Sequence, residues 1–301
     1  MSTTSQPLPP QIFDTTLLQL RRARGADRAA DHDFLLTRIA EDFAGRLGGV
    51  LRSFPVAADI GAHHGPLGRA LASTSGLERW ISIENTVALL RQCSGVQVAG
   101  HPEALPLTPG SIDLAVSALS LHLVNDLPGA LAQIRRALKS DGLLIAALLG
   151  GRTLHELREA WLIAETGVLG GASPRVAPFA DVRDLGGLLQ RAGFALPVVD
   201  SETLTVTYAT PLALMHELKA MGASNMLHER SRSPVSRRLL MRATEVYAER
   251  FALPNGRIPA TFEIITLTAW VPHESQPKPL QPGSATARLA DALGVAEGKL
   301  K

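Results

Sequence analysis

The stretch VAADIGAHHG (residues 56–65) decides the fold class of this chain. Its first five residues form a short apolar run typical of a buried strand, and the nine residues after Gly65, PLGRALAST, have the composition of a helix. A strand that passes through glycines into a helix is how nucleotide-binding turns of parallel α/β proteins begin. One feature departs from that pattern, because His63 and His64 stand where a further glycine is expected after Gly61.

An alternation of strand-like and helix-like segments continues beyond this stretch. Helix-like segments such as 86–93 and 126–138 separate short apolar runs, which lie at 56–60, 80–83, 96–99, 112–119 and 142–149. A polar–apolar alternation at 204–208 and a run rich in β-branched residues at 261–271 predict an antiparallel pair at a sheet edge. The sequence therefore predicts an α/β protein with five parallel strands, a reversed edge pair and helices on both faces.

The segments around this sheet predict the domain organisation. Helical spacing of apolar residues ahead of the first strand predicts N-terminal helices, which we place in residues 1–52. A sheet domain extends over 53–271 and contains a helical cap as an insertion at about 209–257. We expect a turn at KSDG (139–142). The polar, proline-rich residues 272–301 predict a flexible C-terminal tail.

Composition narrows the classes of protein. The chain has 301 residues, of which 46% are hydrophobic and 19% are charged, enough apolar material for a packed core. A net charge of +2 does not favour nucleic acid as a partner. The single cysteine, Cys93, leaves no disulfide framework and fits a reducing compartment. No run of 18 apolar residues occurs, so we expect no membrane segment, and we expect a cytoplasmic or mitochondrial-matrix location.

Candidate site residues follow the ends of the predicted parallel strands. In a doubly wound sheet, ligands bind at the carboxyl ends of the strands. The polar and glycine residues at these ends are Asp59 and Gly61, Glu84, His101 and Glu103, and Ser117, Ser120 and His122. We expect them to form one rim from four strand ends.

Glu84 and the glycine loop point to a nucleoside ligand. A carboxylate at the end of the second strand offers acceptors for both hydroxyls of a ribose, and Gly61 lets the backbone approach a ligand closely. The alternative for Glu84 is a solvated residue at a strand end. The combination of strand, glycine turn, helix and acidic strand end favours the ribose contact.

The spacing of the glycines separates two cofactor classes. A dinucleotide-binding protein would carry G-x-G-x-x-G, and Gly61, Gly65 and Gly68 do not have that spacing. The loop D-x-G-x-x-x-G at 59–65 instead resembles motif I of S-adenosylmethionine-dependent methyltransferases, D-x-G-x-G-x-G, which cradles the methionine and ribose.

Longer segments are similar to one branch of these proteins. They are QIFD (11–14), ALSLHLVNDLP (118–128), SPRVAPFADVRDLGGLLQRAGF (173–194), MGASN (221–225) and IPATFEI (258–264). Together they resemble the complex I assembly factors that hydroxylate an arginine on an iron–sulfur subunit of NADH dehydrogenase, over residues 11–286. The resemblance implies a seven-stranded class I methyltransferase (Rossmann-like) sheet, S-adenosylmethionine as ligand, and that iron–sulfur subunit as partner.

The resemblance also implies the cofactor contacts. They are Asp59, Gly61, Ala62, Gly65, Glu84, His101, Pro102 and Ser117. Two positions depart from the family pattern: His63 replaces the middle glycine of motif I, and His101 replaces an aspartate that holds the adenine amino group. We therefore expect weak binding of S-adenosylmethionine.

Catalysis and metal binding centre on the histidines. His122 follows the fourth strand, where methyltransferases place substrate-facing groups, and it could shuttle a proton near neutral pH; the alternative is a packed rim histidine. His63, His101 and His122 could share one rim, and imidazole suits zinc or iron. Adjacent histidines point in different directions, however, and the family has glycine and aspartate at two of these positions. We expect no metal.

Three functions remain open from the sequence. The first is complex I assembly, with modification of a side chain of the iron–sulfur subunit. The second is methylation of a small molecule or a carrier-bound acyl group, since a looser resemblance exists to malonyl-acyl carrier protein methyltransferases. The third is a non-catalytic chaperone with a decayed cofactor pocket. The arginines of the insertion, at 230, 232, 237, 238 and 242, form either a solvated surface or a partner-facing lid.

Overall fold

The computed structural model describes residues 11–74 and 76–277. The first ten residues and most of the predicted tail (272–301) lie outside these ranges. No helix within the described ranges has both the length and the apolar character needed to span a bilayer.

One seven-stranded sheet organises the chain, in the order β3-β2-β1-β4-β5-β7-β6. Strands β1 to β5 are parallel, as predicted, and β7 is antiparallel to both of its neighbours, β5 and β6. The predicted antiparallel pair at the sheet edge is confirmed as β6 and β7, of which β7 alone runs against the parallel strands. The bounds are β1 Val56–Ile60, β2 Arg79–Glu84, β3 Val96–Ala99, β4 Ile112–Ala118, β5 Leu138–Leu149, β6 Ala195–Tyr208 and β7 Ile258–Trp270.

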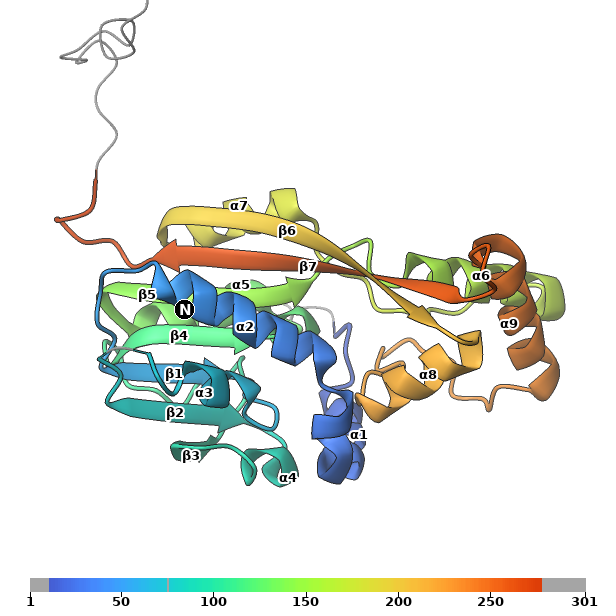
Figure 1. Cartoon of the computed structure of the whole chain (residues 1–301), viewed down its shortest axis with the longest axis horizontal. Coiled ribbons are helices and arrows are strands. Elements are labelled where there is room, and N and C mark those ends of the chain that lie inside the picture. Colours follow the sequence, from blue (N-terminus) through green and yellow to red (C-terminus); the bar gives the residue numbers. More distant parts are fainter. Residues whose placement is uncertain (1–10, 75, 278–301) are drawn as a thin grey trace, which may run out of the picture.

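Helices cover both faces of this sheet (Figure 1). One face packs against α2, α3 and the cap helices, and the other packs against α5 and α7. The helices are α1 Thr15–Gly25, α2 Phe34–Gly48, α3 Pro66–Leu71, α4 Val87–Leu90, α5 Leu127–Ala137, α6 His155–Leu169, α7 Val182–Arg191, α8 Pro211–Ala220 and α9 Arg237–Phe251, with 3₁₀ helices η1 Ala26–His32 and η2 Leu121–Leu123.

The predicted turn at KSDG (139–142) is wrong, because these residues lie within β5. Ile112 pairs with Leu138, whereas Leu114 pairs with Leu143, so β5 bulges between these pairs. The turn-favouring residues therefore produce an irregular strand rather than a break between two elements.

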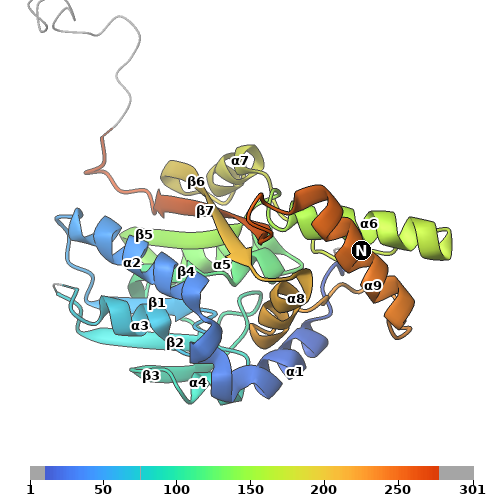
Figure 2. The same ribbon diagram turned by 45° about the vertical axis from the view of Figure 1, so that its right-hand side comes forward.

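The ribbon of β6 and β7 extends past the end of β5. β5 ends at Leu149 opposite Ile264, but β6 and β7 stay paired as far as Tyr208 and Ile258. The projecting end carries α8 and α9, and α9 packs along α6 (Figures 1 and 2). The cap thus packs against the projecting end of β6 and β7, beyond the end of β5.

Helix α1 is held between the rim and the cap. Asp14 caps it by accepting a hydrogen bond from Leu17 N–H (2.9 Å). Asn125, after β4, makes two hydrogen bonds to the backbone of Phe13, accepting from its N–H (2.8 Å) and donating to its carbonyl (3.1 Å). From the other side, Asp14 N–H donates to Met226 O (2.9 Å). These contacts bring together QIFD, VNDLP and Met226, the residue directly after MGASN, although the three lie far apart in the sequence.

Candidate functional site

The loop after β1 takes a shape that requires glycine. Gly61 and Ala62 donate backbone hydrogen bonds to Ile83 O (2.8 and 3.0 Å), which turn the chain toward β2. Gly61 has a φ of 74° and Gly65 a φ of 83°, both in the left-handed region. A Cβ on Gly61 would lie 2.0 Å from Ser120 Oγ. Backbone conformation and a close contact therefore both exclude a side chain at position 61.

His63 also adopts a left-handed conformation, with a φ of 50°. This conformation costs an ordinary non-glycine residue about 1–2 kcal/mol. The His63 N–H donates to Glu84 Oε2 (3.0 Å), and His63 Nε2 lies 3.1 Å from Ala118 O. Burial, and then the nearby Arg22, lower the pKa of His63 well below its usual value, so the ring is neutral and carries its proton on Nε2.

His64 joins the loop to the segment ahead of α2. Its Nε2 lies 3.0 Å from Asp33 Oδ2, just ahead of α2. In the described part of the chain, no three His, Cys, Asp or Glu side chains lie close enough together to hold a metal ion. The described residues therefore give no support to a histidine metal site.

Glu84 presents an ordered carboxylate at the end of β2. Its Oε1 accepts from Thr86 N–H (2.9 Å) and its Oε2 from His63 N–H (3.0 Å). A carboxylate has about four lone-pair positions, so acceptor capacity for a diol remains.

The carboxyl of Asp59 differs: it is buried, and neither oxygen has a hydrogen-bond partner among the described residues. Burial, and then Glu84, raise the pKa of Asp59 well above its usual value, which favours the protonated form.

His101 lies at the same rim, but its acceptor nitrogen is already in use. Its Nδ1 accepts from Glu103 N–H (3.2 Å), and burial lowers its pKa although Glu103 opposes the shift. The neutral ring is therefore assigned a proton on Nε2, and it offers a donor where the aspartate of the family pattern would offer an acceptor. Ser117 is used within the sheet: its buried hydroxyl donates to Ile60 O (2.6 Å).

His122, on η2, faces a large cavity instead of the cofactor rim. Its ring makes an edge contact with Phe179 at 5.6 Å between centroids, and its buried Nδ1 has no partner among the described residues. Burial, and then Arg22, lower the pKa of His122 to about 3. A ring that stays neutral near pH 7 does not fit the predicted proton shuttle, although Nδ1 can accept a hydrogen bond.

A small hollow of about 10 Å³ marks the cofactor rim. Four predicted contacts line it, namely Gly61, Glu84, His101 and Pro102, whereas Asp59, Ala62, Gly65 and Ser117 do not. Leu18 and Arg22 of α1 cover it. Because this volume suffices for about one water molecule, a nucleoside can enter only if α1 moves outward.

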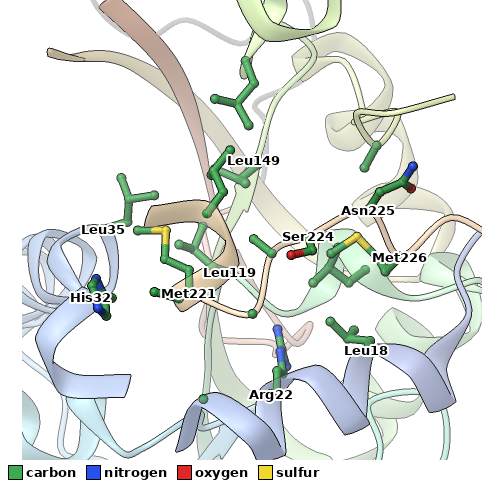
Figure 3. A pocket seen from close by; sticks show the side chains of 18 of the residues that line it. Leu18, Arg22, His32, Leu35, Leu119, Leu149, Met221, Ser224, Asn225 and Met226 are labelled. Carbon is green, nitrogen blue, oxygen red and sulfur yellow. The ribbon is translucent and has the colours of Figure 1, made fainter. Parts of the chain in front are cut away.

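A second hollow, the large cavity, has a volume of about 430 Å³ (Figure 3). It lies between α1, α2, α6 and α8, and three residues, Leu18, Arg22 and Leu123, line both hollows. Arg22 is a site residue that no motif of the sequence indicates. Cations are common in the last turn of surface helices, so the sequence does not distinguish Arg22 from a solvent-exposed arginine. The packing of α1 across the rim makes that distinction.

The arginines of the insertion divide into two groups. Arg230 pairs with Asp14 ahead of α1 (3.1 Å), and Arg242 pairs with Glu245 of its own helix (3.2 Å), so both have an anionic partner. The exposed arginines without an ion pair among the described residues are Arg232, Arg237 and Arg238.

Known proteins are similar to this chain in sequence and in fold. Residues 58–146 match the family model described as a methyltransferase domain. The mitochondrial arginine-hydroxylase NDUFAF5 of Danio rerio is 36% identical over an alignment of 301 residues, covering 96% of this chain and 91% of that protein. A malonyl-[acyl-carrier protein] O-methyltransferase of Halorhodospira halophila is 42% identical over 173 residues, 58% of this chain and 57% of that protein.

A solved structure agrees with the fold. It belongs to a proposed methyltransferase from Bacillus halodurans, with a TM-score of 0.54 and 15% identity, covering 77% of this chain and 98% of that one. The predicted α/β class, with its seven-stranded Rossmann-like methyltransferase sheet, is therefore confirmed. On its near full-length similarity, the chain belongs to the family of the arginine-hydroxylase NDUFAF5.

Proposed function

We propose that this protein binds S-adenosylmethionine at the β1–β2 rim and acts in the assembly of NADH dehydrogenase, by modifying a side chain of its iron–sulfur subunit. The observation that carries this proposal is the similarity to an arginine-hydroxylase over 96% of the chain. A cytoplasmic site of action, or its mitochondrial-matrix equivalent, accords with this role.

The rim residues fit the cofactor in part. Glu84 retains free acceptor positions for a ribose, and Gly61 keeps the backbone open to a ligand. His101 does not fit the role of adenine acceptor, because its Nδ1 already accepts from Glu103 N–H. When bound, S-adenosylmethionine supplies a sulfonium with an activated methyl group.

The chain's own residues shape the reaction space beside this rim. The His63 ring is fixed by Ala118 O, and the neutral ring of His122 lines the cavity wall. Helix α1 lines both hollows with Leu18 and Arg22. A protein side chain must therefore reach the rim after α1 has shifted, or through the large cavity.

A deletion strain tests the proposal. We expect its membranes to lose NADH:quinone activity while succinate:quinone activity stays normal, and wild-type protein to restore the loss. Mass spectrometry of the iron–sulfur subunit then distinguishes an added oxygen from an added methyl group. Normal NADH:quinone activity, with normal content of that subunit, contradicts the assembly role.

Complementation with Glu84→Ala separates catalysis from a chaperone role. We expect this variant to fail, because it loses the carboxylate that orders both His63 N–H and Thr86 N–H. Full rescue would instead favour the non-catalytic chaperone. Transfer of a labelled methyl group to a small molecule or an acyl carrier, with normal complex I, would favour the methyltransferase alternative.

A further inference from the structure

The large cavity has a chemistry that the proposed function leaves unexplained. Its wall consists mainly of leucine, methionine, alanine and aromatic side chains. Its volume of about 430 Å³ falls within the range of about 300–1,000 Å³ that is typical of small-molecule sites. Such a space buries an apolar molecule well and a protein arginine poorly.

Most of the charged groups in the wall are already paired. Arg175 pairs with Glu165 and lies over the Trp161 ring, 4.9 Å from its centroid. Asp33 is 3.0 Å from His64 Nε2. His32 Nδ1 lies 3.0 Å from Glu217 Oε2. These side chains hold the wall together and are not free to bind a ligand.

Arg22 is the exception. Its side chain rises from α1 toward the middle of the cavity (Figure 3), and no hydrogen bond or ion pair engages its guanidinium among the described residues. Burial lowers the pKa of Arg22 and the nearby Glu84 opposes the shift, yet a guanidinium stays charged. A partly buried cation without a partner is costly unless an anion meets it.

The cap fixes the position of Arg22. Gly222 has a φ of 73° and its backbone packs on the stem of Arg22, so that a Cβ there would lie 3.2 Å from Arg22 Cγ. The MGASN segment therefore sets where the guanidinium stands. A binding site for an anion requires a cation that its neighbours hold in place in this way.

We propose that the large cavity binds a small apolar acid, whose carboxylate pairs with Arg22 and whose apolar body lies against the leucine, methionine and aromatic wall. The guanidinium matches a carboxylate in two-point geometry. A positively charged side chain is disfavoured there, because Arg22 would repel it. The inference goes beyond the proposed function and stands without it. The amino-acid end of the cofactor is a second source of a carboxylate, since Arg22 lines both hollows.

Paired ligands test this inference on the full-length protein. Dodecanoate and its neutral counterpart dodecanol are titrated below their aggregation limits, with intrinsic tryptophan fluorescence as readout, to which the wall residue Trp161 contributes. We expect saturable binding of dodecanoate, at least about tenfold tighter than that of dodecanol, the range of a charge-assisted pair. In Arg22→Met we expect this preference to disappear while dodecanol binding persists.

Two controls identify the source of the carboxylate. Arg24→Met changes an exposed arginine on the same helix and should leave all binding unchanged. S-adenosylhomocysteine is titrated into wild type and Arg22→Met, and we expect its affinity to stay within about twofold. Melting temperatures show that each variant is folded.

Three results would overturn the inference. One is equal affinity for dodecanoate and dodecanol in the wild type. Another is an absence of saturable binding of either molecule. The third is an Arg22→Met variant that loses S-adenosylhomocysteine but keeps its preference for dodecanoate, which would assign Arg22 to the cofactor.

Discussion

The small hollow at the rim and the large cavity meet at Arg22, yet they are built from different kinds of sequence. The rim residues Gly61 and Glu84 lie at the ends of adjacent parallel strands, so each directly follows a recognisable apolar run. The cavity wall comes from α1, α2, α6, α8 and the segment 220–226, which meet only after folding. Strand-end sites are visible in a sequence, whereas a site formed by packed helices is not.

The largest expected effect falls on the rim. Gly61→Ala places a Cβ where Ser120 Oγ lies 2.0 Å away and at a φ of 74°. Strain and overpacking together should lower the free energy of unfolding by about 2–5 kcal/mol, measured by urea denaturation. Gly45→Ala, in α2 with nothing within 4 Å, is the control and should stabilise by about 0.5–1 kcal/mol. A Gly61→Ala protein as stable as wild type would show that the loop is not rigid.

The burial of His122 beside the large cavity should make the free energy of unfolding depend on pH. The folded pKa of His122 is about 3 and the unfolded value is about 6.5, so the unfolded chain binds the extra proton between these limits. The contribution of neutral His122 to the free energy of unfolding is therefore complete above about pH 6.5 and is lost as the pH falls toward 3. His122→Leu should flatten the stability profile in this window, by at most about 1.4 kcal/mol per pH unit.

A second buried histidine and a control variant bear on this test. His63, whose pKa is also lowered, acts in the same direction, so the slope should fall without vanishing. His216 is exposed on α8, and its replacement by Leu serves as the control. A His122→Leu profile as steep as that of wild type would mean that His122 does not face an apolar cavity.

A third experiment compares the two altered cofactor contacts with the intact ones. The double variant His63→Gly, His101→Asp removes a left-handed non-glycine residue and supplies a free acceptor. We expect S-adenosylmethionine to bind at least tenfold tighter, from a combined gain of about 2–3 kcal/mol, measured by calorimetry. The single variants apportion the gain. Low-micromolar binding by the wild type without any gain would show that the histidines are harmless.

The contrast between rim and cavity also explains what the sequence could predict. The strands VAADI and VQVA occur with the predicted bounds, since each is a short run rich in apolar residues between helix-like segments. The first part of β6 was missed, because an edge strand that exposes Leu196 (44%) and Val198 (55%) lacks a clear apolar face. The hydrogen bond of His101 has a local cause that no spacing rule indicates, because its Nδ1 accepts from Glu103 N–H.

A fourth prediction concerns the helix that covers both hollows. Asn125→Ala removes two hydrogen bonds to the Phe13 backbone, which should cost about 1–3 kcal/mol. Because the loss is local, amide hydrogen exchange in α1 should accelerate more than that in the core strands. Asn255→Ala, at an exposed turn, is the control. Uniform acceleration across the sheet would indicate that α1 does not open independently.

The smallest effect on stability should occur on the cap, away from both hollows. Arg237 and Arg238 begin α9, are exposed and have no ion pair among the described residues. Reversing both to Glu should change the free energy of unfolding by only about 0–1 kcal/mol, so the melting temperature stays nearly constant. If this surface meets the partner, pull-down of the iron–sulfur subunit should weaken and should depend on salt. The matched control reverses the exposed Arg183 and Arg191 on α7, which changes the net charge equally. Equal loss of pull-down in both variants would assign the effect to overall charge, and no loss in either would leave α9 as a solvated face.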